Sequence, residues 1–164
     1  MYDFIHCPSP IGMLTMVAQG DGLTALVRAG QKHEEKHLAG TGRERETPVL
    51  YRARLWLMRY FEGVAPNPFE IPLRPKGTDF QKKVWCEIQS IPYGETATYG
   101  AIAARLATSP RAVGGAAGRN PLMIFIPCHR VLASDGSLTG YAGGLAVKEK
   151  LLHLEAMGCS FRED

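Results

Sequence analysis

A cysteine followed by two residues that can carry positive charge is the part of this sequence best suited to covalent chemistry. It lies in segment 126–131, Ile-Pro-Cys-His-Arg-Val, at the end of the hydrophobic run 122–126. Pro127 has no N–H and a fixed φ, so it ends regular structure and places Cys128 at a break in the chain. Positive neighbours lower the pKa of a thiol, so we expect the two basic residues to favour the reactive thiolate. The alternative is a buried, inert cysteine that behaves as a small hydrophobe.

Length, composition and charge are those of an ordinary globular protein. The chain has 164 residues, of which 45% are hydrophobic and 21% charged, and these values favour one domain or two small ones over disorder. The net charge of +3 permits a nucleic-acid partner without requiring one. The sequence has no apolar window of about 18 residues and no basic-then-apolar N-terminus, so we expect neither a membrane span nor a signal peptide, and a cytoplasmic location.

The cysteine and histidine spacings give little support for a disulfide or a metal site. The cysteines form no C-x-x-C pair and have no regular spacing, so we expect four reduced thiols: Cys7, Cys86, Cys128 and Cys159. Segment 33–37, His-Glu-Glu-Lys-His, matches the H-E-x-x-H pattern that places two zinc ligands on one helical face. Its neighbours are charged and no third ligand is evident, so we interpret segment 31–46 as a solvated connection and expect no metal.

The first half of the chain predicts a small antiparallel sheet followed by one helix. Alternating residue types predict strands at 2–7, 11–18 and 23–29, with a hairpin turn at 19–22 between the last two. The pair Thr47-Pro48 opens a helix as N-cap and first-turn proline, and the inward residues are expected to be Leu50, Ala53, Leu57, Tyr60 and Phe61. Proline-rich segment 62–77 predicts a stiff linker, which divides the chain into domains 1–76 and 77–164.

The second half of the chain predicts short helices. Thr78 caps the first one, whose inward residues are expected to be Phe80, Val84, Trp85 and Ile88. Thr98 caps a helix over 99–106, and Ser109-Pro110 begins another. Two short helices joined by a short turn form the helix-turn-helix pattern.

The second helix of this pair has almost no side chains. Residues 112–118 are alanine, glycine and one valine, although each glycine costs a helix about 1 kcal/mol. Small residues let a large partner approach, and a DNA backbone or groove would fit, with Arg111 projecting from a helix start that favours phosphate. The alternative is a small-residue seam at which this helix packs against another helix.

A last helix is predicted over about 145–157. On it Lys148, Leu152 and Glu155 share one face. Helix charges at that spacing are more often exposed than buried, so Glu155 taken alone is a weak functional signal. Loop 139–144 before this helix, Thr-Gly-Tyr-Ala-Gly-Gly, must bend sharply or approach a ligand closely.

Taken together, these segments resemble the O6-alkylguanine-DNA alkyltransferase, or methylated-DNA–protein-cysteine methyltransferase, family. The matching motifs are segment 126–131, segment 111–121 and loop 139–144, and the likeness covers residues 78–158 and the first hairpin. It implies an α/β, ribonuclease H-like N-terminal domain and a mostly α, winged-helix-like C-terminal domain. The implied function is direct-reversal DNA repair, in which an alkyl group moves irreversibly, in a single turnover, from O6 of guanine or O4 of thymine to Cys128.

The resemblance also implies a role for each site residue. Cys128 would be the permanent alkyl acceptor, and His129 would deprotonate it through a bridging water. Glu155 would hold the imidazole and Asn120 would brace the cysteine turn. The substrate would be bound by Tyr99, Val131, Tyr141, Ala142 and Lys148. The DNA minor groove would be contacted by Arg111, Ala112, Gly114, Gly115 and Ala117, with Arg111 filling the gap left by a flipped nucleotide.

The implied partner is double-stranded DNA that contains O6-alkylguanine, bound without cofactor or membrane by a monomer that can cluster on DNA. Two features depart from the family pattern. The turn between Leu106 and Arg111 is about two residues shorter than usual, and Ala142 stands where a serine often follows the pocket tyrosine.

Three other functions compete with this one. A non-catalytic lesion binder would lack the acceptor thiol, which is present as Cys128. A regulator that senses alkylation would carry a cysteine-rich zinc module, which this sequence lacks. A thiol hydrolase built on Cys128, His129 and Glu155 would not need the bare helix or Arg111.

Overall fold

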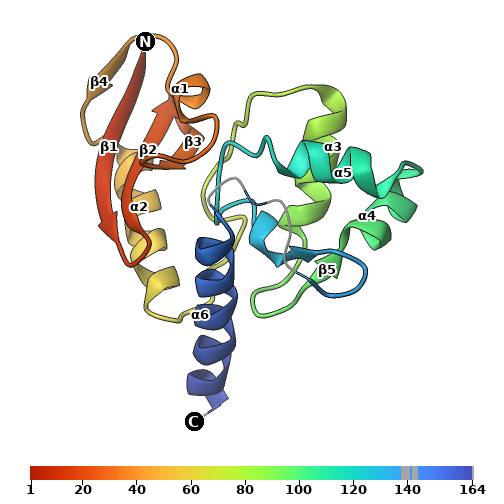
Figure 1. Cartoon of the computed structure of the whole chain (residues 1–164). Helices are drawn as coiled ribbons and strands as arrows, with labels where there is room; N and C mark the ends of the chain where they lie inside the picture. The colour runs from red at the N-terminus through yellow and green to blue at the C-terminus, as the bar shows by residue number, and fades with distance from the viewer. Residues whose placement is uncertain (138–140, 142–143, 164) are drawn as a thin grey trace.

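The chain begins with a three-stranded meander of β1 (Tyr2–Ser9), β2 (Gly12–Gln19) and β3 (Gly22–Arg28), drawn at the left of Figure 1. The computed structural model describes residues 1–137, 141 and 144–163, with side chains as far as residue 158. Both pairings are antiparallel, and Gln19 faces Gly22 across the predicted hairpin turn. The three predicted strands are therefore confirmed, with each boundary within two residues.

A short fourth strand makes the sheet mixed rather than antiparallel. Strand β4 (Gly42–Glu44) pairs in parallel with β1, so the order is β3-β2-β1-β4. It lies in the polar segment that we interpreted as a solvated connection, together with the short helix α1 (Glu34–His37). All three β4 residues are exposed, so no hydrophobic pattern could have revealed the strand.

Helix α2 (Pro48–Phe61) covers one face of this sheet. The Thr47 side chain accepts a hydrogen bond from Leu50 N, as the predicted cap requires. Its buried residues recur at helical spacing: Val49, Leu50, Ala53, Trp56, Leu57 and Tyr60. Phe61, also expected inside, is only partly buried.

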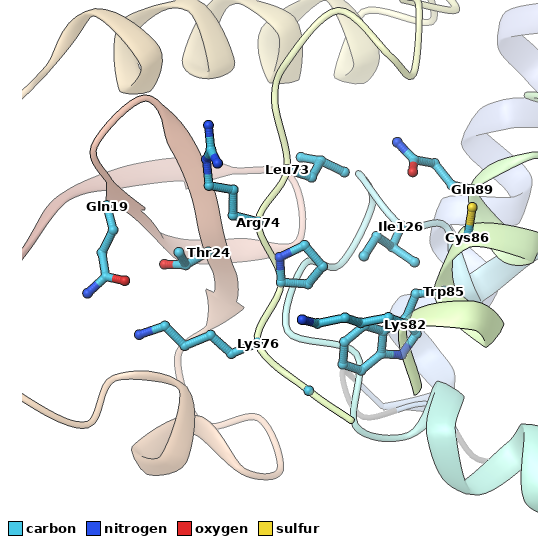
Figure 2. Close-up of a pocket in the computed structure, with 12 residues that line it drawn as sticks. Gln19, Thr24, Leu73, Arg74, Lys76, Lys82, Trp85, Cys86, Gln89 and Ile126 are labelled. Carbon is cyan, nitrogen blue, oxygen red and sulfur yellow. The ribbon is translucent and has the colours of Figure 1, made fainter. Parts of the chain in front are cut away.

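The proline-rich linker is not separate from the sheet. Leu23 N donates to Pro72 O at 2.9 Å and Arg74 N donates to Leu23 O at 2.7 Å, so this part of the linker lies along β3. Figure 2 shows its side chains Leu73, Arg74 and Lys76 around a cavity between the sheet and the helical half. The linker therefore contacts both halves of the chain.

The helical half contains the predicted capped helices. They are α3 (Asp79–Gln89), α4 (Tyr99–Leu106) and α5 (Pro110–Ala117), capped by the side chains of Thr78, Thr98 and Ser109. Helices α4 and α5 pack together in the predicted helix-turn-helix arrangement. Phe80 is 38% exposed, which corrects its predicted inward position. It lies in the first turn of α3, on the same face as the buried Val84 but one turn closer to the start of the helix.

The remaining elements bring the cysteine segment next to the last helix. They are β5 (Ala97–Thr98), the 3₁₀ helix η1 (Cys128–Arg130), β6 (Val131–Leu132) and α6 (Leu145–Glu163). Strand β6 pairs in parallel with β5, and α6 packs against η1. Figure 1 shows α6 standing between the sheet half and the helical half. Within the part of the chain described above, no helix has the length and apolar character needed to cross a membrane.

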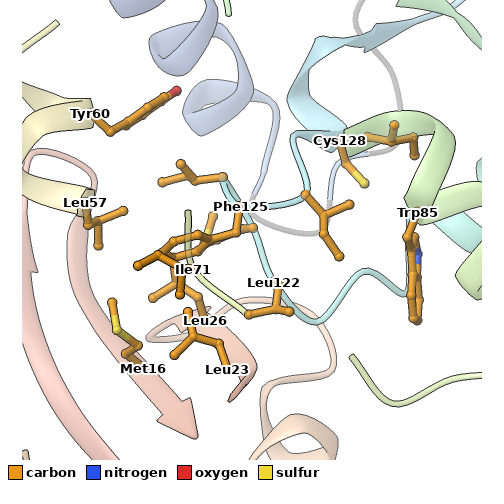
Figure 3. Packing of buried hydrophobic residues seen from close by; sticks show 14 of the residues in the cluster. Met16, Leu23, Leu26, Leu57, Tyr60, Ile71, Trp85, Leu122, Phe125 and Cys128 are labelled. Carbon is orange, nitrogen blue, oxygen red and sulfur yellow. The ribbon is translucent and has the colours of Figure 1, made fainter. Parts of the chain in front are cut away.

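Segment 121–126 joins the two halves through one hydrophobic core. Leu26 N donates to Pro121 O at 2.8 Å, and Leu26 and Leu122 form an isolated parallel bridge. Figure 3 shows Leu122 and Phe125 packed against Met16, Leu23 and Leu26 of the sheet. The run that leads to the cysteine is therefore anchored on the N-terminal sheet.

Replacing Leu122 with alanine tests this shared core. Leu122 is fully buried, so we expect Leu122→Ala to lower the free energy of unfolding by about 2–5 kcal/mol. Urea unfolding should remain one transition by both circular dichroism and tryptophan fluorescence, because both halves share the core. Leu55→Ala, at a site 37% exposed, is the matched control and should change stability by less than about 0.5 kcal/mol. Separate transitions for the two probes would contradict a shared core.

Candidate active site

Cys128 begins a single turn of 3₁₀ helix at the end of the buried run. The run is not a regular strand, because Ile124 has a left-handed φ of 71° and Cys128 N donates back to Ile126 O at 2.7 Å. Pro127 is the residue before η1, so the chain turns at the predicted position. Cys128 is 3% exposed and lies at the edge of the hydrophobic core (Figure 3).

Asn120 braces this turn from three directions. Its Nδ2 donates to Cys128 Sγ at 3.1 Å and to Ile126 O at 2.8 Å. Its Oδ1 accepts from Leu122 N at 2.9 Å. Because all these groups are buried, the amide fixes the sulfur position and supplies a donor that stabilises negative charge on it. This geometry fits the bracing role expected of Asn120.

The carboxylate of Glu155 is the centre of a buried hydrogen-bond network. Its Oε1 accepts from Arg130 Nε at 2.8 Å and from Gly94 N at 3.1 Å. Its Oε2 is 2.5 Å from His129 Nε2 and accepts from Tyr60 Oη at 2.6 Å and Arg130 Nη2 at 3.0 Å. Burial alone would raise the pKa of Glu155, but His129 and Arg130 hold that pKa at about 2. The carboxylate is therefore ionised.

This ionised partner fixes the tautomer of His129. A carboxylate only accepts hydrogen bonds, so the proton of the neutral imidazole lies on Nε2 and Nδ1 is left as an acceptor. Nδ1 is buried and has no hydrogen-bond partner among residues 1–137, 141 and 144–163. Burial lowers the pKa of His129 although Glu155 acts in the opposite direction. The site therefore holds a neutral base with a vacant acceptor atom.

The basic neighbours do not activate the thiol as the sequence predicted. Burial raises the pKa of Cys128 to about 12, against the Asn120 hydrogen bond and the charge of Lys148. Arg130 is turned away, because its guanidinium binds Glu155 and donates to Ile91 O at 2.7 Å. Adjacency in sequence was misleading here, since successive residues of one turn point in different directions. The thiol needs a base when it reacts.

The residues expected to bind the substrate differ in how deeply they are buried and in what they contact. Tyr99 is half-buried at the start of α4, and Tyr141 has a buried hydroxyl without a partner among the described residues. Lys148 is wholly buried, and its Nζ donates to Val131 O at 2.7 Å and lies 5.8 Å from the centroid of the Tyr99 ring. Lys148 thus links two of the other expected substrate residues, Val131 and Tyr99, and its own contact with substrate stays a prediction. Ala142 lies outside the described residues.

Helix α5 has an exposed face and a buried face. The exposed face has the form expected of a DNA-binding surface, and the buried face has the form expected of a small-residue seam between helices. Arg111 and Gly115 are exposed, and a Cβ added at Gly115 would meet no atom within 4 Å. Ala116 and Ala117 are buried, and the Ala116 carbonyl accepts from Trp85 Nε1 at 2.9 Å. Ala117 therefore lies on the buried side of α5, which packs against α3, and its expected DNA contact stays a prediction. The expected contacts Ala112 and Gly114 are half-buried between the two faces.

The H-E-x-x-H match lacks the geometry of a zinc helix. His33 has a left-handed φ of 68° and lies before α1, which has only four residues. Its two histidines therefore do not share one helical face. Across the part of the chain that the structure describes, no group of three potential ligands could hold a metal ion.

Two residues of the network were missed as site residues. Tyr60 was predicted only as an inward residue of α2, and Arg130 only as a charged neighbour of the cysteine. Their common partner Glu155 follows them by 95 and 25 residues. No sequence pattern connects positions so far apart, so only the fold could reveal these contacts.

Comparison with known proteins identifies the family. Residues 1–75 match the ribonuclease-like domain of 6-O-methylguanine DNA methyltransferase, and residues 79–157 match its DNA-binding domain. The chain belongs to the O6-methylguanine DNA methyltransferase family. The resemblance and fold class inferred from the sequence are thereby confirmed, with the sheet mixed rather than antiparallel.

Relatives in this family match the chain over most of its length. The methylated-DNA–protein-cysteine methyltransferase of Haemophilus influenzae is 41% identical over 154 residues, covering 93% of this chain and 85% of the relative. That of Methanosarcina barkeri is 46% identical over 158 residues, covering 94% and 96%. A crystal structure of Mycobacterium tuberculosis OGT in complex with DNA has a TM-score of 0.84 at 38% identity, covering 95% and 94%.

The bracing role of Asn120 can be measured through the reactivity of the thiol. We expect Asn120→Leu, which keeps much of the volume but loses the donor to sulfur, to raise the pKa of Cys128. Alkylation of Cys128 by iodoacetamide at pH 8 should slow about tenfold per unit of that rise, as followed by mass spectrometry. The exposed Cys86 provides the internal reference. Unchanged alkylation of Cys128 in a folded variant would show that the Asn120 donor does not stabilise the thiolate.

Proposed function

We propose that this protein repairs DNA by moving a methyl group from O6 of guanine to Sγ of Cys128. The observation that carries this proposal is a buried thiol followed in the chain by a neutral histidine, whose Nδ1 has no hydrogen-bond partner in the described part of the chain and whose Nε2 faces an ionised carboxylate. The relatives that are named methylated-DNA–protein-cysteine methyltransferases support it. Transfer from O4 of thymine is part of the same proposal, because the acceptor would again be Cys128 and the reacting carbon would again be a methyl group bound to a base oxygen.

The chemistry follows from the positions of the protons. His129 Nδ1 takes the proton of the Cys128 thiol through a bridging water, and Glu155 stabilises the imidazolium. The thiolate attacks the methyl carbon, so that the S–C bond forms as the C–O6 bond breaks. The electron pair stays on the base, which takes up a proton to become guanine. Water does not cleave the thioether, so each protein molecule reacts once and needs no cofactor.

We assign recognition of the lesion to the exposed face of α5 and to the pocket near Cys128. A base inside a duplex cannot present its O6 substituent to a buried sulfur, so the nucleotide must leave the stack at a cost of a few kcal/mol. Arg111 on the exposed face would fill the gap in the duplex. Tyr99 would donate to the extruded base and Tyr141 would line its pocket, with the backbone of Val131 reading the purine edge.

The same proposal covers the organisation and location of the protein. We place the boundary between the sheet domain and the DNA-binding domain at residues 76 and 77, which the gap between the two matched segments supports. We propose that a monomer binds each lesion and that further copies can cluster on DNA. The relatives named above are bacterial and archaeal, and in cells without a nucleus DNA lies in the cytoplasm, which is the proposed compartment.

Transfer of a labelled methyl group tests the proposed function. A duplex that contains O6-[³H-methyl]guanine should pass its label to the protein in an amount equal to the protein present. Mass spectrometry should locate the methyl group on Cys128, and Cys128→Ala should bind the duplex but take no label. Cys86→Ala is the matched control, because this cysteine is exposed and takes no part in the hydrogen bonds around Glu155. Label retained by DNA, or transferred equally to Cys128→Ala, would refute the proposal.

Gly115→Ala tests the proposed DNA-binding face of α5. Alanine is a better helix former, and its Cβ would stand in open space, so stability should rise by about 1 kcal/mol. The same methyl group would obstruct close approach of a duplex, so the dissociation constant for undamaged duplex should increase. Thermal unfolding and fluorescence anisotropy measure the two effects. Because they have opposite signs, misfolding cannot explain weaker binding, and unchanged binding would exclude Gly115 from the interface.

A further inference from the structure

The N-terminal domain contributes one polar atom to the catalytic network, the hydroxyl of Tyr60. This tyrosine lies on α2, is fully buried and contacts the His129 ring edge-on at a centroid distance of 6.5 Å. Its Oη donates to Glu155 Oε2 at 2.6 Å and lies 3.4 Å from His129 Nε2. The residue therefore contacts both groups that hold the Nε2 proton of the histidine.

Tyr60 and His129 compete for the same carboxylate oxygen. Both His129 Nε2 and Tyr60 Oη lie against Oε2, which also accepts from Arg130 Nη2 at 3.0 Å, while Oε1 accepts from Arg130 Nε and Gly94 N. A carboxylate oxygen that already accepts one strong hydrogen bond attracts a second proton less strongly. The hydroxyl of Tyr60 thus reduces the stabilisation that Glu155 gives to a charged imidazolium.

We propose that Tyr60 is a positioning residue that keeps His129 neutral by sharing the Oε2 atom of Glu155. This inference rests on the proposed function, because it assigns a purpose to the basicity of His129. It makes the N-terminal domain part of the reaction, in addition to its part in the shared core. A histidine that became charged at rest could not take the proton of Cys128.

The effect of the Tyr60 hydroxyl on the pKa of His129 can be separated from the effects of the charged groups nearby. Tyr60 faces His129 from α2, Glu155 and Lys148 from α6, and Arg130 from η1. Of these groups, the substitution Tyr60→Phe would remove only the Tyr60 hydroxyl. Burial and the nearby Glu155 raise the pKa of Tyr60 well above its usual value, so the hydroxyl stays a neutral donor throughout the accessible pH range.

The direction of the expected change follows from the loss of this donor. In Tyr60→Phe, Oε2 would bind the imidazolium more strongly, so the pKa of His129 would rise. Transfer requires neutral His129, and its rate falls as the pH drops through that pKa. The acid limb of the single-turnover rate should therefore move to higher pH by about half a unit to one unit, the size expected for the net contribution of one typical hydrogen bond. At high pH the rate should match that of the unmodified protein.

The titration of His129 gives a readout that does not depend on methyl transfer. We would follow the imidazole ¹⁵N and ¹³C signals by NMR against pH, in the intact protein without DNA. The midpoint for His129 should rise in Tyr60→Phe by the same amount as the acid limb. If no methyl transfer occurs in any variant, the proposed function fails, and this titration still decides whether Tyr60 sets the basicity of His129.

Two control variants separate positioning from structure. Tyr51→Phe removes a hydroxyl from an exposed site on the same helix and should leave both midpoints unchanged. In a Glu155→Gln background, Tyr60→Phe should produce no further upward shift, because its effect acts through the carboxylate. An unchanged or lower His129 midpoint in a folded Tyr60→Phe protein would overturn the proposal. So would an equal loss of rate at every pH, which is the result expected from a purely structural role.

Discussion

The burial of one ionised carboxylate is the constraint on which the rest of this structure depends. An unpaired charge in the interior costs several kcal/mol, so Glu155, which is 1% exposed, requires a complete set of donors. These come from α2, from the turn before β5 and from η1, which are far apart in the sequence. The network can form only when the sheet, the cysteine turn and the last helix are all in place. Assembly of the fold and assembly of the site are therefore one event.

The hydrogen-bond network around Glu155 determines the resting state of the reactive thiol, Cys128. Burial protects Cys128 and keeps it protonated, because a thiolate would be poorly solvated there. The neighbouring His129 is kept neutral by burial and oriented by Glu155, so the proton acceptor is ready while the nucleophile is at rest. A protein that reacts only once benefits from this arrangement, since a permanently charged thiol would be open to side reactions. The same burial requires that the substrate be brought to the sulfur.

The small residues of α5 show how one short helix can serve two contacts. The side that carries Ala116 and Ala117 lets α3 approach closely, and a hydrogen bond from Trp85 fixes the distance. The side that carries Gly115 is exposed, and a Cβ built at this glycine would meet no atom of the described residues within 4 Å. A glycine there weakens the helix without improving any internal contact, which is the pattern expected where a partner molecule needs the space.

The sequence by itself determined the local structure and the chemistry. Cap residues such as Thr78 and Ser109 marked the helix starts, and the motif around Cys128 indicated the family, because these signals depend on neighbouring residues only. The tertiary structure decided which charges are buried and what they bind. Helical spacing suggested exposure for Glu155, but the fold surrounds it with donors that include Tyr60, 95 residues away. Such contacts depend on how distant segments pack, and no short-range pattern encodes that packing.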